Sequence, residues 1–289
     1  MKEREIVICT ESGSDVPEHL VEKYDFHVIP MHVIMDMQSY DDGRFPVDKV
    51  YEYYERTKKV PSTSAVNVNE YAEMWAQLRQ KVPGCVIFQF TYSSKASSTW
   101  ASAQIAVKSF PDVYIIDTLN VSGGCTAHMI ACWELIQKRK EEGVKDYAAL
   151  AEECQELAKR AVCHFIPGTL EYLRAGGRVS NAQYIGATLL NLKPLIEMVD
   201  GELIATKKYR GSMAKICDPF MKEFTEKYKL DKKCLYLMYS KGLAQEVLDH
   251  MAENAEALGF QSWEYVMTGC VISCHGGKGA IGLAGMLEG

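Results

Sequence analysis

The stretch CVIFQFTYSSKASSTWASAQIAVKSF, residues 85–110, decides the fold of this chain. Its first seven residues are mostly apolar and β-branched or aromatic, and they predict a buried strand over 85–91. Its last thirteen residues, 98–110, predict a helix. The loop between these two segments is crowded with serines. A strand that runs through a short loop into a helix is the repeating unit of an α/β fold with a parallel sheet.

The same unit recurs on both sides of this stretch. Further strands are predicted at 5–10, at 26–35 with an interruption at Pro30, and at 113–118. Apolar residues at helical spacing predict a helix within 46–57. Asn67 and Glu70 have the spacing of a capping box, so another helix is expected to begin near Asn67. This alternation predicts a parallel sheet with helices on both faces in the N-terminal part of the chain.

The second half of the chain has a different, mixed order of elements. The predicted elements are helices at 122–142, 145–161, 213–228 and 243–258, a hairpin turning at Asp200–Gly201, and strands at 234–240, 262–267 and 270–274. The glycine pair 176–177 is expected to end a helix. We therefore expect two α/β lobes, an N-terminal lobe over 1–162 and a mixed C-terminal lobe over 163–289.

Composition restricts the class of protein. The 289 residues are 47% hydrophobic and carry a net charge of −6, with lysines and arginines scattered along the chain, which argues against a nucleic-acid partner. No apolar run reaches the length of about 18 residues that spans a membrane, and the charged start does not read as a signal peptide. The ten cysteines are therefore expected as reduced thiols in the cytoplasm.

Several familiar motifs of enzyme chemistry do not fit. The segment GKGAIG, 277–282, matches the glycine pattern of dinucleotide-binding loops, but the chain has no acidic residue about 20 positions further on. The sequence contains no P-loop and neither the zinc-protease nor the serine-hydrolase motif. Cys270, Cys274 and His275 lack a second pair of metal ligands at structural spacing. No metal and no cofactor are expected.

Hydroxyl side chains follow three of the predicted strands, within 10–14, 91–94 and 118–122. Since ligands bind at the carboxyl ends of parallel strands, these groups are expected to gather at one edge and hold a carboxylate or phosphate. A further hydroxyl loop, 61–67, precedes a helix start, where anions are favoured. The alternative interpretation is that these residues only cap helices and form turns. Arg178 and Arg210, beside glycines in loops, could bind an anion or an acidic partner, or remain solvated charges.

Seven segments together resemble the DegV family of fatty-acid-binding proteins, and the likeness covers essentially the whole chain. They are VICTESGSDVP (7–17), HVIPMHVIMDMQSYDDG (27–43), PSTSAVNVNEY (61–71), YSSKASSTWASA (92–103), LEYLRAGGRVS (170–180), LLNLKPLIEMVDGEL (189–203) and HGGKGAIGL (275–283). No single segment is decisive, but their order and spacing make the resemblance specific. It implies two lobes with a long-chain fatty acid in an apolar tunnel between them.

The resemblance also implies roles for individual residues. The carboxylate would be held by Thr63 and its neighbour Ser64 and by Ser93 or Ser94, with Ser94 favoured. The imidazole of His275 and the backbone at Gly276 would close the same site. Three further residues, Ser12, Arg178 and Arg210, match positions near the ligand or a partner.

The partner follows from the same resemblance. Some family members present the fatty acid to a separate ATP-dependent kinase subunit, which makes an acyl phosphate. This implies a lipid-binding protein rather than an enzyme, with at most transient membrane contact. Two alternatives stay open: a stand-alone phosphotransferase or hydrolase that uses His275 with a nearby serine, and a lipid-sensing regulator without a kinase. The chain departs from the family pattern at Glu11, Ser98, Trp100 and Lys278, which affects the expected head-group geometry.

Overall fold

The N-terminal sheet of the computed structural model has four parallel strands in the order β2-β1-β6-β7. The structure describes residues 4–180 and 192–289. The strands are β1 (Ile6–Glu11), β2 (Phe26–Ile29), β6 (Val86–Thr91) and β7 (Val113–Asp117). The parallel sheet predicted from the sequence is therefore confirmed.

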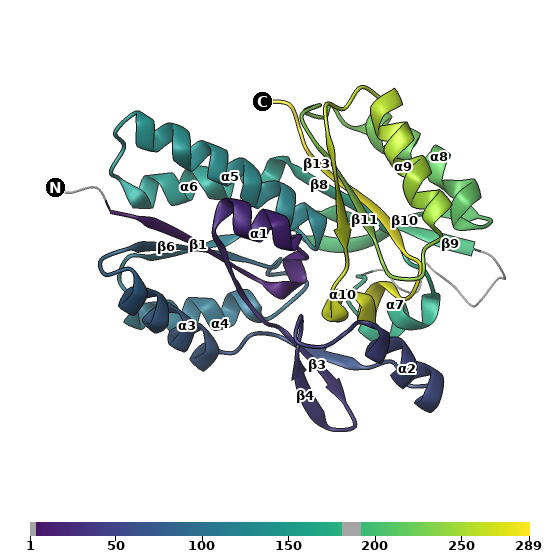
Figure 1. Cartoon of the computed structure of the whole chain (residues 1–289), viewed down its shortest axis with the longest axis horizontal. Helices are drawn as coiled ribbons and strands as arrows, with labels where there is room; N and C mark the ends of the chain where they lie inside the picture. Colours follow the sequence, from purple (N-terminus) through teal and green to yellow (C-terminus); the bar gives the residue numbers. More distant parts are fainter. Residues whose placement is uncertain (1–3, 181–191) are drawn as a thin grey trace.

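Helices cover both faces of this sheet (Figure 1). They are α3 (Val68–Lys81) and α4 (Thr99–Ala106) on one face, and α5 (Gly123–Glu141) and α6 (Tyr147–Leu157) on the other, with α1 (Glu18–Tyr24) beside β2. Alternate strand residues enter the two cores: Ile8 packs in the cluster with α5, and Val7 in the cluster with α3. Burial on both faces explains why these strands read as continuous apolar runs. The predicted capping box of Asn67 and Glu70 is present at the start of α3.

Pro30 divides the predicted strand 26–35 into two strands of different sheets. The second part is β3 (His32–Met35), which pairs antiparallel with β4 (Gln38–Asp41) and β5 (Ser62–Ser64). Proline has no backbone N–H and cannot continue a ladder on both sides. The strands β4 and β5 were not predicted. β4 is exposed along its whole length and carries no apolar alternation, and β5 consists of only three hydroxyl residues.

The C-terminal sheet has six strands in the order β10-β9-β8-β13-β11-β12. They are β8 (Ala161–Ile166), β9 (Leu192–Val199), β10 (Glu202–Arg210), β11 (Leu235–Tyr239), β12 (Trp263–Met267) and β13 (Ile281–Met286). The β9–β10 hairpin turns at Asp200–Gly201, as predicted, and both turn residues have positive φ. Residues 189–191 of the quoted segment 189–203 lie outside the described part of the chain.

Helices α8 (Met213–Lys227) and α9 (Gln245–Ala257) cover one face of this second sheet, and α5 packs on β8, β11 and β13 (Figure 1). Because α5 also covers the parallel sheet, one hydrophobic cluster extends from Ile8 to Ala284 across both lobes. Nowhere in 4–180 and 192–289 is there a helix both long and apolar enough to cross a membrane.

The strand predicted at 270–274 is wrong. These residues form the helix α10 (Cys270–Gly276), which packs against α7 (Leu170–Gly176) and α2 (Asp48–Thr57). Cys270 and Cys274 are four positions apart and both buried, which is the spacing of one helix face. The strand of this region is β13 instead. Its glycines Gly282 and Gly285 weaken the sequence signal for a strand.

Candidate ligand-binding site

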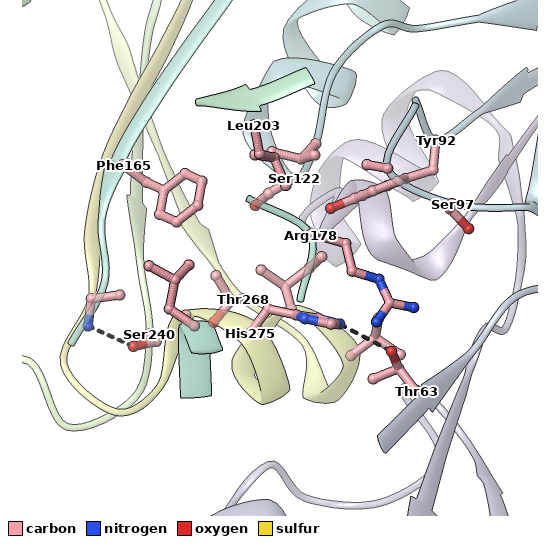
Figure 2. Close-up of a pocket in the computed structure, with 18 of the residues that line it drawn as sticks. Thr63, Tyr92, Ser97, Ser122, Phe165, Arg178, Leu203, Ser240, Thr268 and His275 are labelled. Carbon is pink, nitrogen blue, oxygen red and sulfur yellow. Dashed lines mark hydrogen bonds between the residues drawn. The ribbon is translucent and has the colours of Figure 1, made fainter. Parts of the chain in front are cut away.

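A cavity of about 260 Å³ lies where the two lobes meet (Figure 2). Residues of both lobes line it: β5, the loop after β6 and the start of α5 on one side, and α7, α10 and the strands β8, β10, β11 and β13 on the other. The lining includes Met31, Thr63, Ser64, Tyr92, Ser97, Ser98, Val121, Ser122, Phe165, Leu173, Arg178, Val179, Leu203, Met238, Ser240, Thr268, His275, Gly276 and Gly282. Four predicted contact residues, Thr63, Ser64, His275 and Gly276, are thus brought to one cavity.

The polar end of this cavity is formed by Thr63, His275 and Arg178. The Oγ1 atom of Thr63 on β5 lies 3.0 Å from Nε2 of His275 on α10. The Arg178 guanidinium lies beside both side chains (Figure 2). One of its nitrogens donates to the backbone carbonyl of Gly176 at 2.5 Å, so the guanidinium keeps further donors for a ligand.

The imidazole of His275 is neutral at physiological pH. Burial, together with the nearby charge of Arg178, lowers the pKa of His275 to about 4. The Nδ1 atom of the ring is buried and has no hydrogen-bond partner in the described residues. A Cβ atom on Gly176 would lie only 2.2 Å from Nδ1, so the ring occupies the space that this glycine leaves.

The two serines expected to hold the carboxylate lie elsewhere. Ser93 is fully buried, and its hydroxyl donates to the carbonyl of Gly201 at 2.6 Å. This bond ties the loop after β6 to the hairpin turn of the other lobe. The amide of Ser94 donates to the Asp117 carboxylate at 3.2 Å. Neither Ser93 nor Ser94 is among the residues that line the cavity.

Ser12 and Arg210 are not brought to the cavity either. The Oγ atom of Ser12 accepts a hydrogen bond from the backbone amide of Met31 at 3.0 Å. Ser12 therefore holds the backbone of Met31, which lines the cavity. Arg210 is exposed at the end of β10. Arg178 alone of the two predicted arginines lines the cavity.

The sequence reasoning missed several hydroxyls that do line the cavity. Ser97 and Ser98 belong to the same serine-rich loop, but the sequence does not reveal which of its serines face inward. Ser97 Oγ accepts from the Thr99 amide at 3.3 Å, which leaves its hydroxyl hydrogen able to donate. By contrast, the other two serine hydroxyls already donate within the protein. The Ser122 hydroxyl donates to the Asp15 carboxylate and the Ser240 hydroxyl to the carbonyl of Gly277, each at 2.5 Å.

Apolar side chains form the rest of the wall. They are Val121, Phe165, Leu173, Val179, Leu203, Met238, Val271, Ile272 and Ile281. Phe165 and Leu203 lie on the side of the cavity opposite Thr63 (Figure 2). The cavity therefore suits a molecule with an anionic or polar head at one end and an apolar body.

Buried carboxylates hold the elements that carry the polar end. Glu11 accepts from the amide of Tyr92 at 2.5 Å and from the Tyr71 hydroxyl, and burial raises the pKa of Glu11 to about 7. Asp15 accepts from the Gly269 amide and Asp42 from the Cys270 amide, each at 2.8 Å. These last two bonds run from loops of the N-terminal lobe to the start of α10, where they satisfy backbone N–H groups that have no partner within the helix.

The cysteines beside His275 serve packing. The thiol of Cys270 donates to the carbonyl of Phe45 at 3.5 Å, and Cys274 is fully buried in the cluster with α2 and α3. In residues 4–180 and 192–289, no three side chains of His, Cys, Asp or Glu are grouped so that they could hold a metal ion.

Several known proteins are similar to this chain in sequence and in fold. The chain is 32% identical over 213 residues to a protein of Thermotoga maritima described as a fatty acid-binding protein, with 71% of this chain and 72% of the relative covered. A structure reporting fatty acid binding of a DegV family protein from Thermus thermophilus superposes with a TM-score of 0.84 at 25% identity, over 98% of this chain and 100% of that one. A DegV lipid binding protein from Thermotoga maritima gives a TM-score of 0.82 at 25% identity, over 98% and 99%.

These likenesses confirm the two-lobed α/β fold expected from the sequence. The family model described as "Uncharacterised protein, DegV family" matches residues 5–287. The resemblance stated from seven sequence segments is thereby confirmed, and the chain belongs to the DegV family.

Proposed function

We propose that this protein binds one long-chain fatty acid in the cavity between its lobes, with the carboxylate at the polar end. The observation that carries the proposal is the division of one cavity into a polar end at Thr63, Arg178 and His275 and an apolar wall. The names of the relatives support the same ligand class. Within the head-group set we place Thr63 and Ser97 as hydroxyl donors, with Ser64 and Gly276 beside them.

Ser93 and Ser94 have a supporting role in this proposal. Since the Ser93 hydroxyl donates to Gly201, it holds the serine-rich loop in place for Ser97. We assign His275 the tautomer with its hydrogen on Nε2. Because this Nε2–H donates to Thr63 Oγ1, the threonine hydroxyl can donate its own hydrogen to the carboxylate.

The energetics favour an acyl ligand. Burying an acyl chain of roughly 16 carbons gains about 0.8 kcal/mol per methylene, on the order of 10 kcal/mol before costs. Association and ordering offset much of this gain. The head group therefore mainly orients the ligand, for which hydroxyl donors are sufficient.

The proposed partner is a separate ATP-dependent kinase subunit that phosphorylates the bound carboxylate. Hydroxyl donors leave a carboxylate oxygen nucleophilic, and phosphoryl transfer depends mostly on positioning and electrostatics. We place this event in the cytoplasm and assign the lobes to residues 1–162 and 163–289. Incubation of the lipid-loaded chain with ATP and Mg²⁺ should give no acyl phosphate unless the kinase subunit is added. Acyl phosphate formed by the chain alone would contradict this assignment.

A stand-alone hydrolase is the second candidate, because Thr63 and His275 have the spacing of a nucleophile and its base. Catalytic dyads of this kind use a third group that orients the imidazole. Nδ1 of His275 has no such partner in the described residues, so we favour the binding role.

Mass spectrometry of an organic extract from gently purified protein tests the ligand class. We expect one fatty acid per chain in near-stoichiometric amount. A clean extract from well-folded protein, together with no binding of added fatty acids, would overturn the proposal.

A further inference from the structure

Met238 is a buried side chain on β11 that lines the cavity. Its register partner Gly282 also pairs with Phe165, which lies on the side of the cavity opposite Thr63 (Figure 2). Met238 comes from a different element than the residues of the polar end, which belong to β5, to α10 and to the segment after α7. Two glycines make room for its side chain.

The two glycines are Gly123, the first residue of α5, and Gly282 on β13. A Cβ atom on Gly123 would lie 2.8 Å from both Cγ and Sδ of Met238, and a Cβ on Gly282 would lie 2.5 Å from its Cε. Carbon atoms do not approach this closely, so the outer half of the methionine fills the space that the missing Cβ atoms leave. We call this space, bounded by Gly123, Gly282 and Cys163, the methionine niche.

Further contacts hold the side chain in the methionine niche. The amide of Gly123 donates to Met238 Sδ at 3.2 Å, and the Cys163 thiol lies 4.0 Å from the same sulfur. Met238 and Gly282 are register partners on neighbouring strands. The unbranched methionine can follow this narrow space, which a β-branched or aromatic side chain could not enter.

We propose that Met238, held in the methionine niche, ends the space for the acyl chain and so sets which acyl length the protein binds best. This inference rests on the proposed function and deepens it. Shortening the side chain would empty the niche and open it to the cavity. Filling the niche would push the methionine toward the ligand, because Gly282 and Cys163 close the other sides.

Two substitutions test the proposal in opposite directions. Met238→Ala removes Cγ, Sδ and Cε and makes room for about two methylenes of ligand. Each buried methylene contributes about fourfold in affinity. In Met238→Ala, the affinity for a fatty acid two carbons longer than the wild-type optimum, relative to the affinity for that optimum, should therefore rise by roughly tenfold. Gly123→Ala places a Cβ against Met238, its next contact being an ordinary 3.7 Å to Ala284. The Gly123→Ala variant should therefore prefer shorter fatty acids than the wild type.

Gly285→Ala is the matched control. It lies on β13 outside the cavity lining, and its Cβ would make only ordinary contacts, the nearest at 3.5 Å to Leu230. The experiment is calorimetric titration of the delipidated full chain with saturated fatty acids of 12 to 20 carbons, alongside circular dichroism of each variant.

The expected result is opposite shifts for Met238→Ala and Gly123→Ala and none for Gly285→Ala. If either variant fails to fold, the other carries the test by the direction of its shift. Wild-type binding with an unchanged length profile in the folded variants would overturn this inference alone. The absence of binding at every length by the wild type would overturn the proposed function and this inference with it.

Discussion

The Thr63 hydroxyl and the His275 imidazole lie 3.0 Å apart although 212 positions separate them in the sequence. One belongs to the short strand β5 of the three-stranded sheet, and the other to α10, which the C-terminal lobe supplies. A carboxylate bound to this pair would contact both lobes at once. The geometry of the pair therefore depends on how the two lobes are held together.

Thr63→Ala should weaken fatty acid binding by about tenfold to a hundredfold, because a hydrogen bond to a charged group contributes roughly 1.5–3 kcal/mol. Thr63→Ser should keep most of the affinity, since it retains the hydroxyl. Ser62→Ala, on the same strand but outside the lining, is the control. Calorimetric titration with one fatty acid measures the effect. Equal affinities for Thr63→Ala and wild type would show that this hydroxyl does not hold the ligand.

Gly176→Ala should displace the His275 ring, because the new Cβ would meet Nδ1 at 2.2 Å. We expect a loss of about 1–3 kcal/mol in the free energy of unfolding and at least tenfold weaker fatty acid binding. Gly285→Ala again serves as the control for adding one methyl group. Urea unfolding and ligand titration measure the two effects. Unchanged values in both assays would contradict the tight packing of this ring.

Ser93→Ala and Ser97→Ala should separate a structural serine from a ligand-binding one. Loss of the Ser93 hydroxyl leaves the buried carbonyl of Gly201 without its donor and should lower the free energy of unfolding by about 1–3 kcal/mol. Ser97→Ala should change stability little and weaken ligand binding. Urea unfolding and titration on the same samples decide the matter. If Ser93→Ala weakened ligand binding and Ser97→Ala lowered stability instead, Ser93 would be the serine that contacts the carboxylate.

The stability of the protein should depend on pH through His128. Burial lowers the pKa of His128 to about 4, while its Nε2–H donates to the carbonyl of Cys154 at 2.8 Å. Between pH 4 and 6.5 the unfolded chain binds a proton that the folded chain does not, so this group's contribution is lost as pH falls through that window. From pH 7 to pH 5 the loss should be roughly 2 kcal/mol.

His128→Gln should remove that part of the dependence. Glu11 acts in the opposite direction, because its raised pKa of about 7 makes the folded state the better proton binder between pH 4.5 and 7. The difference between wild type and His128→Gln isolates the histidine, since both chains contain Glu11. Urea unfolding at pH 5 and pH 7 provides the measurement. An identical pH dependence of the two proteins would show that His128 is not held neutral.

The order of strands and helices followed from local patterns in the sequence. Continuous apolar runs such as 85–91 identified the strands that are buried on both faces, and the Asn67–Glu70 spacing identified the start of α3. The short strands β4 and β5 and the glycine-containing β13 carried too weak a pattern to be predicted, and α10 was predicted as the wrong type of element. Its apolar residues and its neighbouring glycines fit a strand equally well in isolation, and only packing against α7 and α2 makes it a helix.

By itself, the sequence determined the fold class and the family, because these depend on composition and on motif order. Tertiary structure alone decided which hydroxyls face the cavity. Ser93 and Ser97 lie four positions apart in one loop, yet one donates to Gly201 of the other lobe and the other lines the cavity. That choice depends on the direction in which the loop turns after β6, and contacts with distant residues such as Gly201 and Glu11 fix that direction.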